Sequence, residues 1–299
     1  MLNAVRKGII MSIPVIIDCD NTMGVAGCDV DDGLALLYLL GSPEVNLLGL
    51  TCSYGNNKQD VVYNNVSRLF KLWNREDIPF FRGSANPGEY QSEAAEFIAA
   101  QAKKYEGELR LLVLGSTTNI LGAAKICPDF WSKIHSISFM GGITEPLIVG
   151  GKPMDELNLS IDWRSSLEIL RNAPNISIAT AHNCFESYFP KSCFLEILEK
   201  HPGKLADYLK SELDYWYDIH EKVWNLDGII NWDVMAAVQM LHPEYFDLNE
   251  TVISPSEDSF HTGLLLGGGK EIKVNLPKIK NREEYIAHVY EHYFAAKIF

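Results

Sequence analysis

Several common features are scarce or missing in this sequence, and each absence narrows what the protein can be. No apolar run reaches the roughly 18 residues that a membrane-spanning helix requires. Basic residues are the minority, because 26 Lys and Arg stand against 39 Asp and Glu, which gives a net charge of -13. An acidic chain of this kind is not expected to bind nucleic acid or an anionic membrane as its main task. Small neutral or cationic ligands remain compatible with it.

Cysteine follows no pairing pattern. The six cysteines are scattered along the chain and include no Cys-x-x-Cys pair. We therefore expect reduced thiols and a cytoplasmic location. The N-terminus is mildly basic and then apolar, without a small-residue cleavage site, so the apolar run is interpreted as a first strand. Residues 1–11 are interpreted as a disordered extension or as the segment before an alternative start at Met11.

Repeats, low-complexity stretches and linkers were not found, so residues 1–299 are expected to form a single domain. Short apolar runs alternate with helical patterns. Strands are predicted at 13–18, 46–52, 109–114, 134–140 and 176–180, and helices at 31–40, 61–73, 119–126 and 283–296, with a helix-rich stretch at 194–240. This alternation predicts an α/β fold with an open sheet, mainly parallel or mixed, and helices on both of its faces.

Aspartate is abundant near the N-terminus. Segment 18–32 reads DCDNTMGVAGCDVDD. Asp18 and Asp20 leave a strand while Asp31 and Asp32 open a helix, so the two pairs can converge at the edge of the sheet where ligands bind. Closely packed carboxylates need a cation or protons, and oxygen donors without Cys or His favour calcium or magnesium. The simpler alternative is that Asp31 and Asp32 only favour the start of the helix.

One resemblance is confined to this segment. Residues 18–22, DCDNT, resemble the DxDxT motif of haloacid-dehalogenase-type phosphatases, in which the first Asp is the nucleophile and the second is the general acid. The downstream acidic motif of that family, commonly GD followed by D, was not found. A magnesium-dependent phosphatase is therefore kept as an alternative.

A second resemblance, to the inosine-uridine-preferring nucleoside hydrolases, covers most of the chain. The DxD and DD motifs of that family match residues 18–20 and 31–32, with a spacer of ten residues rather than three. Further matches follow in order: LLGLTCSYGNN at 47–57, LLVLGSTTNILGAA at 111–124, MGG at 140–142 with ELN at 156–158, and NWD at 231–233. Each motif alone is weak, but five in order at compatible spacing are a specific signal.

The resemblance implies calcium-dependent hydrolysis of the N-glycosidic bond of ribonucleosides to ribose and free base. Calcium would be bound by the side chains of Asp20, Asp32 and Asp233 and by the backbone carbonyl of Thr118. Asp20 would also be the catalytic base that accepts a proton from the attacking water. The substrate would be contacted by Asp31, Asn56, Met140, Glu156 and Asn158, with Glu156 at the 5′-hydroxyl. The family is commonly a homodimer or homotetramer, so a homo-oligomer is expected.

The residue before the last metal ligand departs from the commonest family pattern. Many members have His there, and this chain has Trp232. The Trp-Asp pair resembles the purine-preferring, inosine-adenosine-guanosine branch. An indole is no useful acid at neutral pH, but it can stack on a protonated purine. We therefore expect Trp232 to contact the base and assist catalysis on purine nucleosides, whereas the alternative is that Trp232 belongs to the core.

Other departures bear on the same site. Gly150 stands where the family often has Asn, and Asp29, in the long spacer, could compete for the role of Asp20 or Asp31. Segment 21–28 is expected to form a loop over the metal edge that narrows access to the ribose 5′ side. His182 is interpreted as structural, and aromatic stretch 215–224 as core or as a wall over the base. The long spacer also leaves a non-catalytic ribose- or nucleoside-binding protein open.

Overall fold

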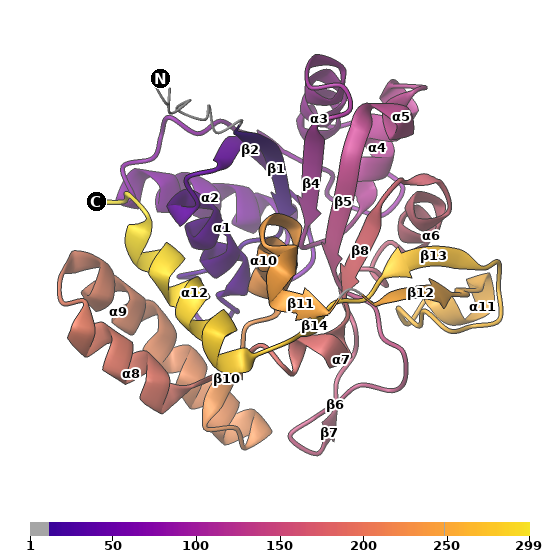
Figure 1. Ribbon diagram of the computed structural model, residues 1–299. Coiled ribbons are helices and arrows are strands. Elements are labelled where there is room, and N and C mark those ends of the chain that lie inside the picture. Colours follow the sequence, from indigo (N-terminus) through magenta and orange to yellow (C-terminus); the bar gives the residue numbers. More distant parts are fainter. Residues whose placement is uncertain (1–11, 248) are drawn as a thin grey trace, which may run out of the picture.

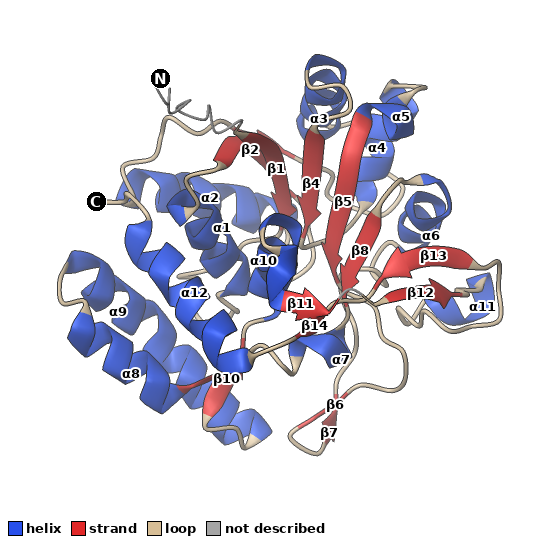
Figure 2. Ribbon diagram, in the orientation of Figure 1, coloured by secondary structure: helices blue, strands red, loops and turns tan. Residues whose placement is uncertain are grey.

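An eight-stranded sheet forms the centre of the computed structural model, which describes residues 12–247 and 249–299 (Figures 1 and 2). The predictions for residues 1–11, including the alternative start at Met11, lie outside the described residues. The strand order is β12-β13-β8-β5-β4-β1-β2-β3, and only the edge strand β12 runs antiparallel to its neighbour. This confirms the predicted α/β class with a mainly parallel, mixed sheet.

The central sheet is built from strands that are mostly short. They are β1 (Ile13–Cys19), β2 (Val45–Cys52), β3 (Phe80–Arg82), β4 (Leu109–Val113), β5 (Ile134–Met140), β8 (Ile176–Ala179), β12 (Glu250–Ile253) and β13 (Ile272–Asn275). Three small antiparallel pairs lie outside it: β6 (Ile148–Val149) with β7 (Lys152–Pro153), β9 (Tyr188–Pro190) with β10 (Gly228–Ile230), and β11 (Phe246–Asp247) with β14 (Lys278–Ile279).

Helices cover both faces of the sheet (Figure 2). One face packs against α1 (Asp31–Gly41), α2 (Gln59–Leu72), α10 (Trp232–Leu241) and α12 (Arg282–Ala295), with α7 (Ala181–Cys184), α8 (Lys191–Lys200), α9 (Lys204–Ile219) and the turns η1 (His220–Trp224) and η2 (Pro243–Tyr245) on the same side. The other face packs against α3 (Glu93–Lys104), α4 (Thr118–Ile126), α5 (Phe130–Lys133), α6 (Trp163–Asn172) and α11 (Glu257–Phe260).

The alternation of side chains along the strands divides the core in two. In β1, Val15 and Ile17 belong to the core on the α1 side, whereas Ile16 belongs to the core on the α4 side. All three are fully buried. Successive residues of a strand point to opposite faces, so a strand covered on both faces needs an unbroken apolar run. That requirement explains why β1 was recognisable in the sequence.

The predicted elements that formed apolar runs or strong helical patterns are present within one or two residues of their expected ends. The sequence pattern predicted no strand at β3 and no helices at α3 and α6, and the helix-rich stretch 194–240 contains the strand β10. The apolar face of α3 is largely alanine, which gives a weak helical signal. Strand β10 has only three residues and pairs with β9 about 40 residues earlier, so no local pattern marks it.

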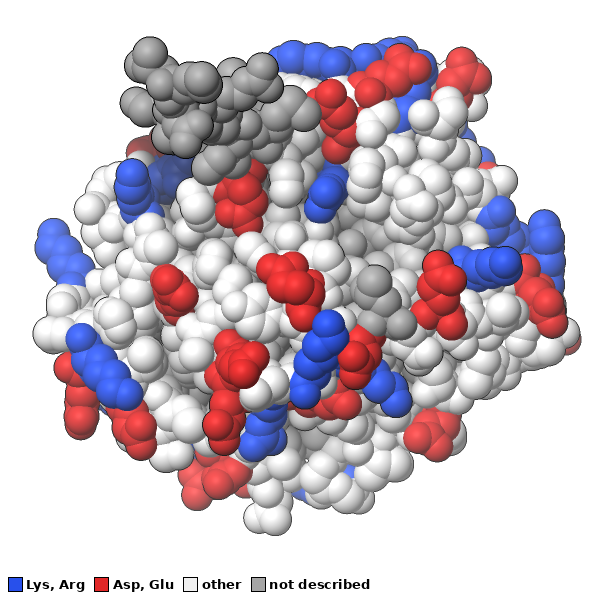
Figure 3. Space-filling view, in the orientation of Figure 1, with Lys and Arg blue, Asp and Glu red and all other residues white. Residues whose placement is uncertain are grey.

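The surface carries charges of both signs. On the face shown in Figure 3, acidic and basic side chains are interspersed over the described residues. No helix among the described residues is long and apolar enough to cross a membrane.

Candidate active site

A pocket opens where the carboxyl ends of the parallel strands meet. Its cavity volume is about 110 Å³, and it is open to solvent. Its lining includes Asn56 after β2, Leu114 after β4, Met140 at the end of β5 and Ala181 after β8. Ligands of open parallel sheets bind at this edge, because the strand-to-helix loops converge there. The pocket is therefore the candidate active site.

An acidic cluster lies at this pocket, and some of its members line it. Asp31 and Asp32 begin α1, Asp233 lies in the first turn of α10, and Asp20 directly follows β1. Asp20 and Asp32 are fully buried. Asp31 and Asp233 line the pocket and are almost as deeply buried. The positive ends of α1 and α10 favour acidic residues at these positions, so helix starts and a strand end bring distant carboxylates together.

Asn56 contacts the two most deeply buried carboxylates of the cluster. Its backbone N–H donates to Asp20 Oδ2 at 2.5 Å, and its side-chain amide lies 3.5 Å from Asp20 Oδ1 and from Asp32 Oδ2. A Cβ atom at the preceding residue, Gly55, would overlap the Asp20 carboxylate. The close approach of the loop after β2 therefore needs glycine at position 55 and fixes the orientation of Asp20.

Too many carboxylates lie close together in this cluster for all of them to stay charged without a cation. Burial, with a smaller contribution from nearby Asp29, raises the pKa of Asp20 to about 7. Burial also raises the pKa values of Asp31, Asp32 and Asp233 well above the usual range, and their mutual repulsion adds to this. Asp32 Oδ1 is buried without a hydrogen-bond partner among the described residues. An all-oxygen donor set with an unpaired buried oxygen fits a hard divalent cation such as calcium or magnesium.

Asp29 is also a member of this cluster. Its carboxylate lies within 4.8 Å of those of Asp31 and Asp32, and it lines the pocket. Thr22 Oγ1 donates to Asp29 Oδ1 at 3.0 Å. The sequence had left the role of Asp29 open, because its place depends on the path of the ten-residue spacer between Asp20 and Asp31. The structure brings it to the pocket.

The spacer itself is anchored to two helices. The side-chain amide of Asn65 on α2 donates to the carbonyls of Asn21 and Met23, each at 3.1 Å. Tyr215 on α9 donates to the carbonyl of Cys28 at 2.6 Å. The spacer thus runs from the buried residues 21–23 to a more exposed turn and returns at Cys28. It lies beside the acidic cluster, as expected. That segment 21–28 narrows the access of substrate to the ribose 5′ side stays a prediction.

The opposite wall is formed by β5 and the ELN segment. Met140 lies at the end of β5, and the amide of Asn158 donates to the Met140 carbonyl at 3.1 Å. Both residues line the pocket. The same amide lies 3.4 Å from the Met140 sulfur, so the two predicted ribose contacts hold each other in place.

Glu156 also lines the pocket, but its carboxylate is largely occupied by the backbone. Oε1 accepts from the N–H groups of Gly142 and Leu159 at 3.0 and 2.7 Å, and Oε2 accepts from that of Ser160 at 2.8 Å. Burial raises its pKa, and these backbone bonds oppose the shift. Glu156 therefore organises the loop that carries Asn158, and its predicted contact with a 5′-hydroxyl stays a prediction.

Trp232 occupies the remaining side of the pocket. It is half-buried, lines the pocket beside Asp233, and makes an edge-to-face contact with Phe185 at 5.9 Å between ring centroids. Part of the indole packs on the core, as in the alternative interpretation, while the residue still faces the pocket. His182 also makes an edge-to-face contact with Phe185, at 5.9 Å between ring centroids, and it is not among the lining residues of this pocket.

Thr118 lies one layer behind the pocket. Its hydroxyl donates to Asp162 Oδ2 at 2.6 Å and is 2.9 Å from the Tyr54 hydroxyl. The next residue, Asn119, donates to Asp18 Oδ2 at 2.9 Å. This loop is thus tied to the end of β1, and the use of the Thr118 carbonyl as a metal ligand stays a prediction.

Two features singled out in the sequence lie away from the pocket. Gly150 is in the turn of the β6–β7 hairpin, where a Cβ atom would overlap the Trp224 carbonyl, and it lines a separate apolar pocket. None of the aromatic residues at 215–224 lines the main pocket: Tyr217 is buried and stacks on Phe194 at 5.3 Å, which is core packing. Some lining residues were not predicted from the sequence, such as Leu147 and Met154, which flank the hairpin and the ELN segment.

Comparisons with known proteins agree with this geometry. The family model "Inosine-uridine preferring nucleoside hydrolase" matches residues 15–276. The curated relatives include "Probable uridine nucleosidase 2" of Arabidopsis thaliana, 26% identical over 79% of this chain and 82% of the relative. They also include a "Pyrimidine-specific ribonucleoside hydrolase RihA" of Shewanella sp. (strain MR-4), 25% identical over 80% of this chain and 81% of the relative.

Solved structures show the same fold at lower sequence identity. The plant nucleoside hydrolase PpNRh1 superposes with a TM-score of 0.79 at 22% identity, covering 94% of this chain and 98% of that one. A purine-preferring ribonucleoside hydrolase from Gardnerella vaginalis gives a TM-score of 0.80 at 19% identity, covering 95% and 99%. The family match spans most of the sequence and includes every residue assigned to the pocket. The chain therefore belongs to the inosine-uridine preferring nucleoside hydrolase family and is an N-glycosyl hydrolase.

Proposed function

We propose that this chain hydrolyses ribonucleosides to ribose and free base, that it depends on calcium, and that it prefers purine nucleosides. The observation that carries the proposal is the convergence of Asp20, Asp31, Asp32 and Asp233 at one edge of a pocket whose lining also includes Trp232. The acidic wall suits a cation and a sugar, and the aromatic wall suits a base. The family match gives the phosphatase alternative no support.

The carboxylates have different roles in the reaction. Asp20, Asp32 and Asp233, with the Thr118 carbonyl, would hold calcium, which supplies the positive charge that makes a nearby water easier to deprotonate. Asp20 accepts the proton of the attacking water. The Asn56 N–H, 2.5 Å from Asp20 Oδ2, holds the carboxylate in a fixed orientation after the end of β1. The water adds at C1′ as the bond to the base breaks, through a ribosyl transition state with oxocarbenium character.

The ribose is positioned by residues on two walls. On the acidic side, the Asp31 carboxylate accepts hydrogen bonds from the ribose hydroxyls and the Asn56 amide also binds them. The Asn158 amide binds the ribose hydroxyls from the side of the ELN segment. Met140 packs against the sugar ring. Glu156 reaches the 5′-hydroxyl with the lone pairs that its backbone bonds leave free. Orientation of this kind lowers the barrier because the sugar is held in line with the water.

Base preference is proposed from Trp232. A half-buried indole at the pocket wall offers a flat surface for a purine. The electron pair of the C1′–N9 bond goes to the base as that bond breaks, and solvent supplies a proton to N7 of the purine. Stacking on the indole favours this protonated base. The curated relatives above are named for uridine or pyrimidine nucleosides, which favours uridine as the second candidate substrate. Inosine and uridine are therefore the decisive pair to compare.

One assay tests the whole proposal. Reducing-sugar release is measured from inosine, adenosine, guanosine, uridine and cytidine, with calcium and with a chelator. We expect fastest release from a purine nucleoside and loss of activity on chelation. Uridine preferred tenfold or more would refute purine preference and leave hydrolysis standing. Binding of nucleosides without ribose release would favour the non-catalytic alternative, and release of phosphate from p-nitrophenyl phosphate would favour the phosphatase.

The cellular location and the assembly belong to the same proposal. All six cysteines are free in the structure, which supports a reducing compartment such as the cytoplasm. A homodimer or homotetramer follows from the family resemblance. Light scattering after size-exclusion chromatography tests the assembly, and a monomer at micromolar concentration would contradict it.

A further inference from the structure

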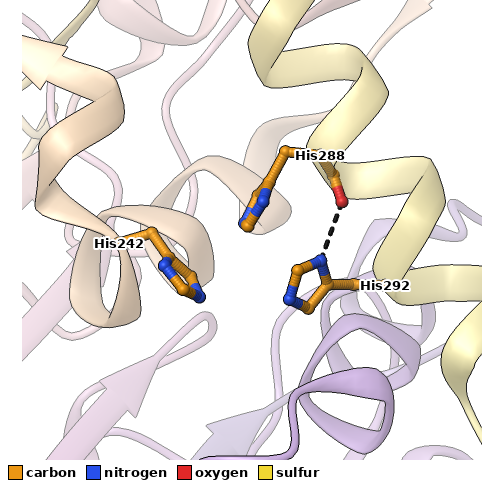
Figure 4. A group of neighbouring side chains, drawn as sticks. All are labelled: His242, His288 and His292. Carbon is orange, nitrogen blue, oxygen red and sulfur yellow. Dashed lines mark hydrogen bonds between the residues drawn. The ribbon is translucent and has the colours of Figure 1, made fainter.

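Three histidines gather far from the pocket. His288 and His292 are one helical turn apart on α12, and His242 ends α10, so the three rings face one another from two elements (Figure 4). One ring nitrogen from each lies within 4.8 Å of the others. The rings of His288 and His292 are 4.1 Å apart between centroids, and those of His242 and His288 are 4.5 Å apart. The family's reaction uses none of these residues.

Each ring is held through one nitrogen by a neighbouring group. His292 Nδ1 is 2.8 Å from the His288 carbonyl, His288 Nε2 is 2.9 Å from the Tyr38 hydroxyl, and His242 Nδ1 is 2.9 Å from Glu244 Oε1. Histidines that bind metal commonly use one ring nitrogen for the ion and the other for an orienting hydrogen bond. The arrangement leaves the second nitrogen of His292 and of His288 for a ligand.

Glu44 completes the group. Its Oε1 lies 2.8 Å from His242 Nε2, and both side chains are about one-fifth exposed. A carboxylate at this position can therefore share an ion with the imidazole while remaining reachable from solvent.

We propose that His242, His288 and His292 bind one divalent transition-metal ion of the zinc type, with the Glu44 carboxylate as the fourth ligand. Three imidazoles and one carboxylate suit zinc, nickel or cobalt, whereas calcium and magnesium prefer oxygen. Small rotations of the three rings would bring the nitrogens, which lie within 4.8 Å of one another, to bonding distance. Protein groups fill all four positions of a tetrahedral ion, so the role is structural.

The site would fasten three elements together. Tyr38 and Glu44 lie at the C-terminal end of α1 and just beyond it, His242 ends α10, and α12 supplies the other two histidines. The opposite ends of α1 and α10 carry Asp31, Asp32 and Asp233. A helix of ten or eleven residues is about 15 Å long, so the ion would hold these two helices in place from a distance without touching the substrate.

The test uses the full chain, stripped with a chelator and then saturated with calcium so that the acidic cluster is filled. Zinc is titrated against a chromophoric competitor. We expect one tightly bound zinc per chain and a rise in Tm of several degrees. His292→Gln should weaken binding at least 100-fold and Glu44→Gln about tenfold. His261→Gln, at an exposed histidine outside the cluster, should match the wild type.

A spectroscopic measurement keeps the test decisive if a variant does not fold. Zinc-edge X-ray absorption of the wild-type chain should show histidine scattering from about three imidazoles. A shell of oxygen atoms alone, no zinc bound at micromolar concentration, or equal binding by His292→Gln and the wild type would each overturn the proposal. Because calcium fills the acidic cluster throughout, these outcomes are independent of the proposed hydrolysis.

Discussion

The Tyr215 hydroxyl donates a 2.6 Å hydrogen bond to the carbonyl of Cys28, the residue directly before Asp29. Tyr215 lies on α9, which follows Cys28 in the chain by almost two hundred residues, yet the bond ends the spacer beside the acidic cluster. This single contact links an outer helix to the position of a pocket carboxylate. It therefore offers a direct way to ask whether the spacer contributes to the site.

Loss of that hydroxyl should loosen the end of the spacer. A hydrogen bond of this kind contributes about 1 kcal/mol, so Tyr215→Phe should lower kcat/KM about fivefold, mainly through KM, while the far-UV spectrum is unchanged. Steady-state kinetics on the best nucleoside measures the effect. Tyr105→Phe at the end of α3 is the matched control and should behave as wild type. Equal kinetics in both variants would mean that the spacer does not act on the pocket.

Asp20 is expected to be the base. Asp20→Asn keeps the shape and can still accept the hydrogen bond from Asn56 N–H, but an amide cannot take a proton from water. We expect kcat to fall by about 10²- to 10⁴-fold with little change in Tm. Asp129→Asn, at an exposed residue, controls for charge. Near-wild-type turnover in Asp20→Asn combined with a large loss in Asp29→Asn would transfer the role to Asp29.

Removal of the cation should affect both activity and stability. Without it, the buried carboxylates of Asp20, Asp31, Asp32 and Asp233 repel one another or must take up protons. A ligand at 100 times its Kd stabilises a fold by about 2.7 kcal/mol, so chelation should lower Tm by about 5–10 °C and abolish ribose release. Calcium should restore both. Unchanged Tm and activity in chelator would contradict a cation at this cluster, and Asp32→Asn should make Tm less sensitive to calcium.

Trp232 is expected to act on the leaving base. Trp232→Ala should lower kcat for inosine about tenfold more than for p-nitrophenyl riboside, whose leaving group needs no proton; a tenfold effect corresponds to about 1.4 kcal/mol, within the range of a cation–π contact. Parallel kinetics on the two substrates measures the difference. Phe185→Leu, which removes only the ring behind the indole, should have a smaller effect. Equal losses on both substrates would assign Trp232 to packing.

His220 should make the fold sensitive to acid. Burial lowers its pKa to about 4, and the Trp216 carbonyl 3.0 Å from Nδ1 only partly opposes this. Histidine in an unfolded chain has a pKa of about 6.5. Between pH 6.5 and 4 the unfolded chain therefore binds a proton that the folded chain does not, and stability falls as pH is lowered, by up to about 3 kcal/mol. Above pH 6.5 the effect vanishes.

Urea unfolding at pH 7 and pH 4.5 measures that effect. His220→Gln retains an amide that can donate to the Trp216 carbonyl, so its free energy of unfolding should fall less between the two pH values than that of the wild type. His261→Gln should keep the wild-type dependence, because that side chain is exposed. An unchanged pH dependence in His220→Gln would show that another group is responsible.

The sequence alone determined the elements whose signals are local. β1 is an apolar run because both of its faces are buried, and α1 opens with two acidic residues because its positive end favours them. Strand ends of a parallel sheet meet at one edge, so Asp20, Asn56 and Met140 could be assigned to one site before their distances were known. Family motifs added Asp233 and the ELN segment.

Tertiary structure decided whatever depends on contacts between distant segments. The path of the spacer is fixed by Asn65 and Tyr215, 44 and 187 residues from their partners, so only the fold could bring Asp29 to Asp31 and Asp32. Gly150, in the β6–β7 turn, lies at a separate pocket rather than at the main one, and this too depends on contacts with a distant segment. His242 meets His288 and His292 because α10 and α12 both pack on α1. Such long-range contacts leave no periodicity or spacing in the sequence, since they depend on how whole helices pack.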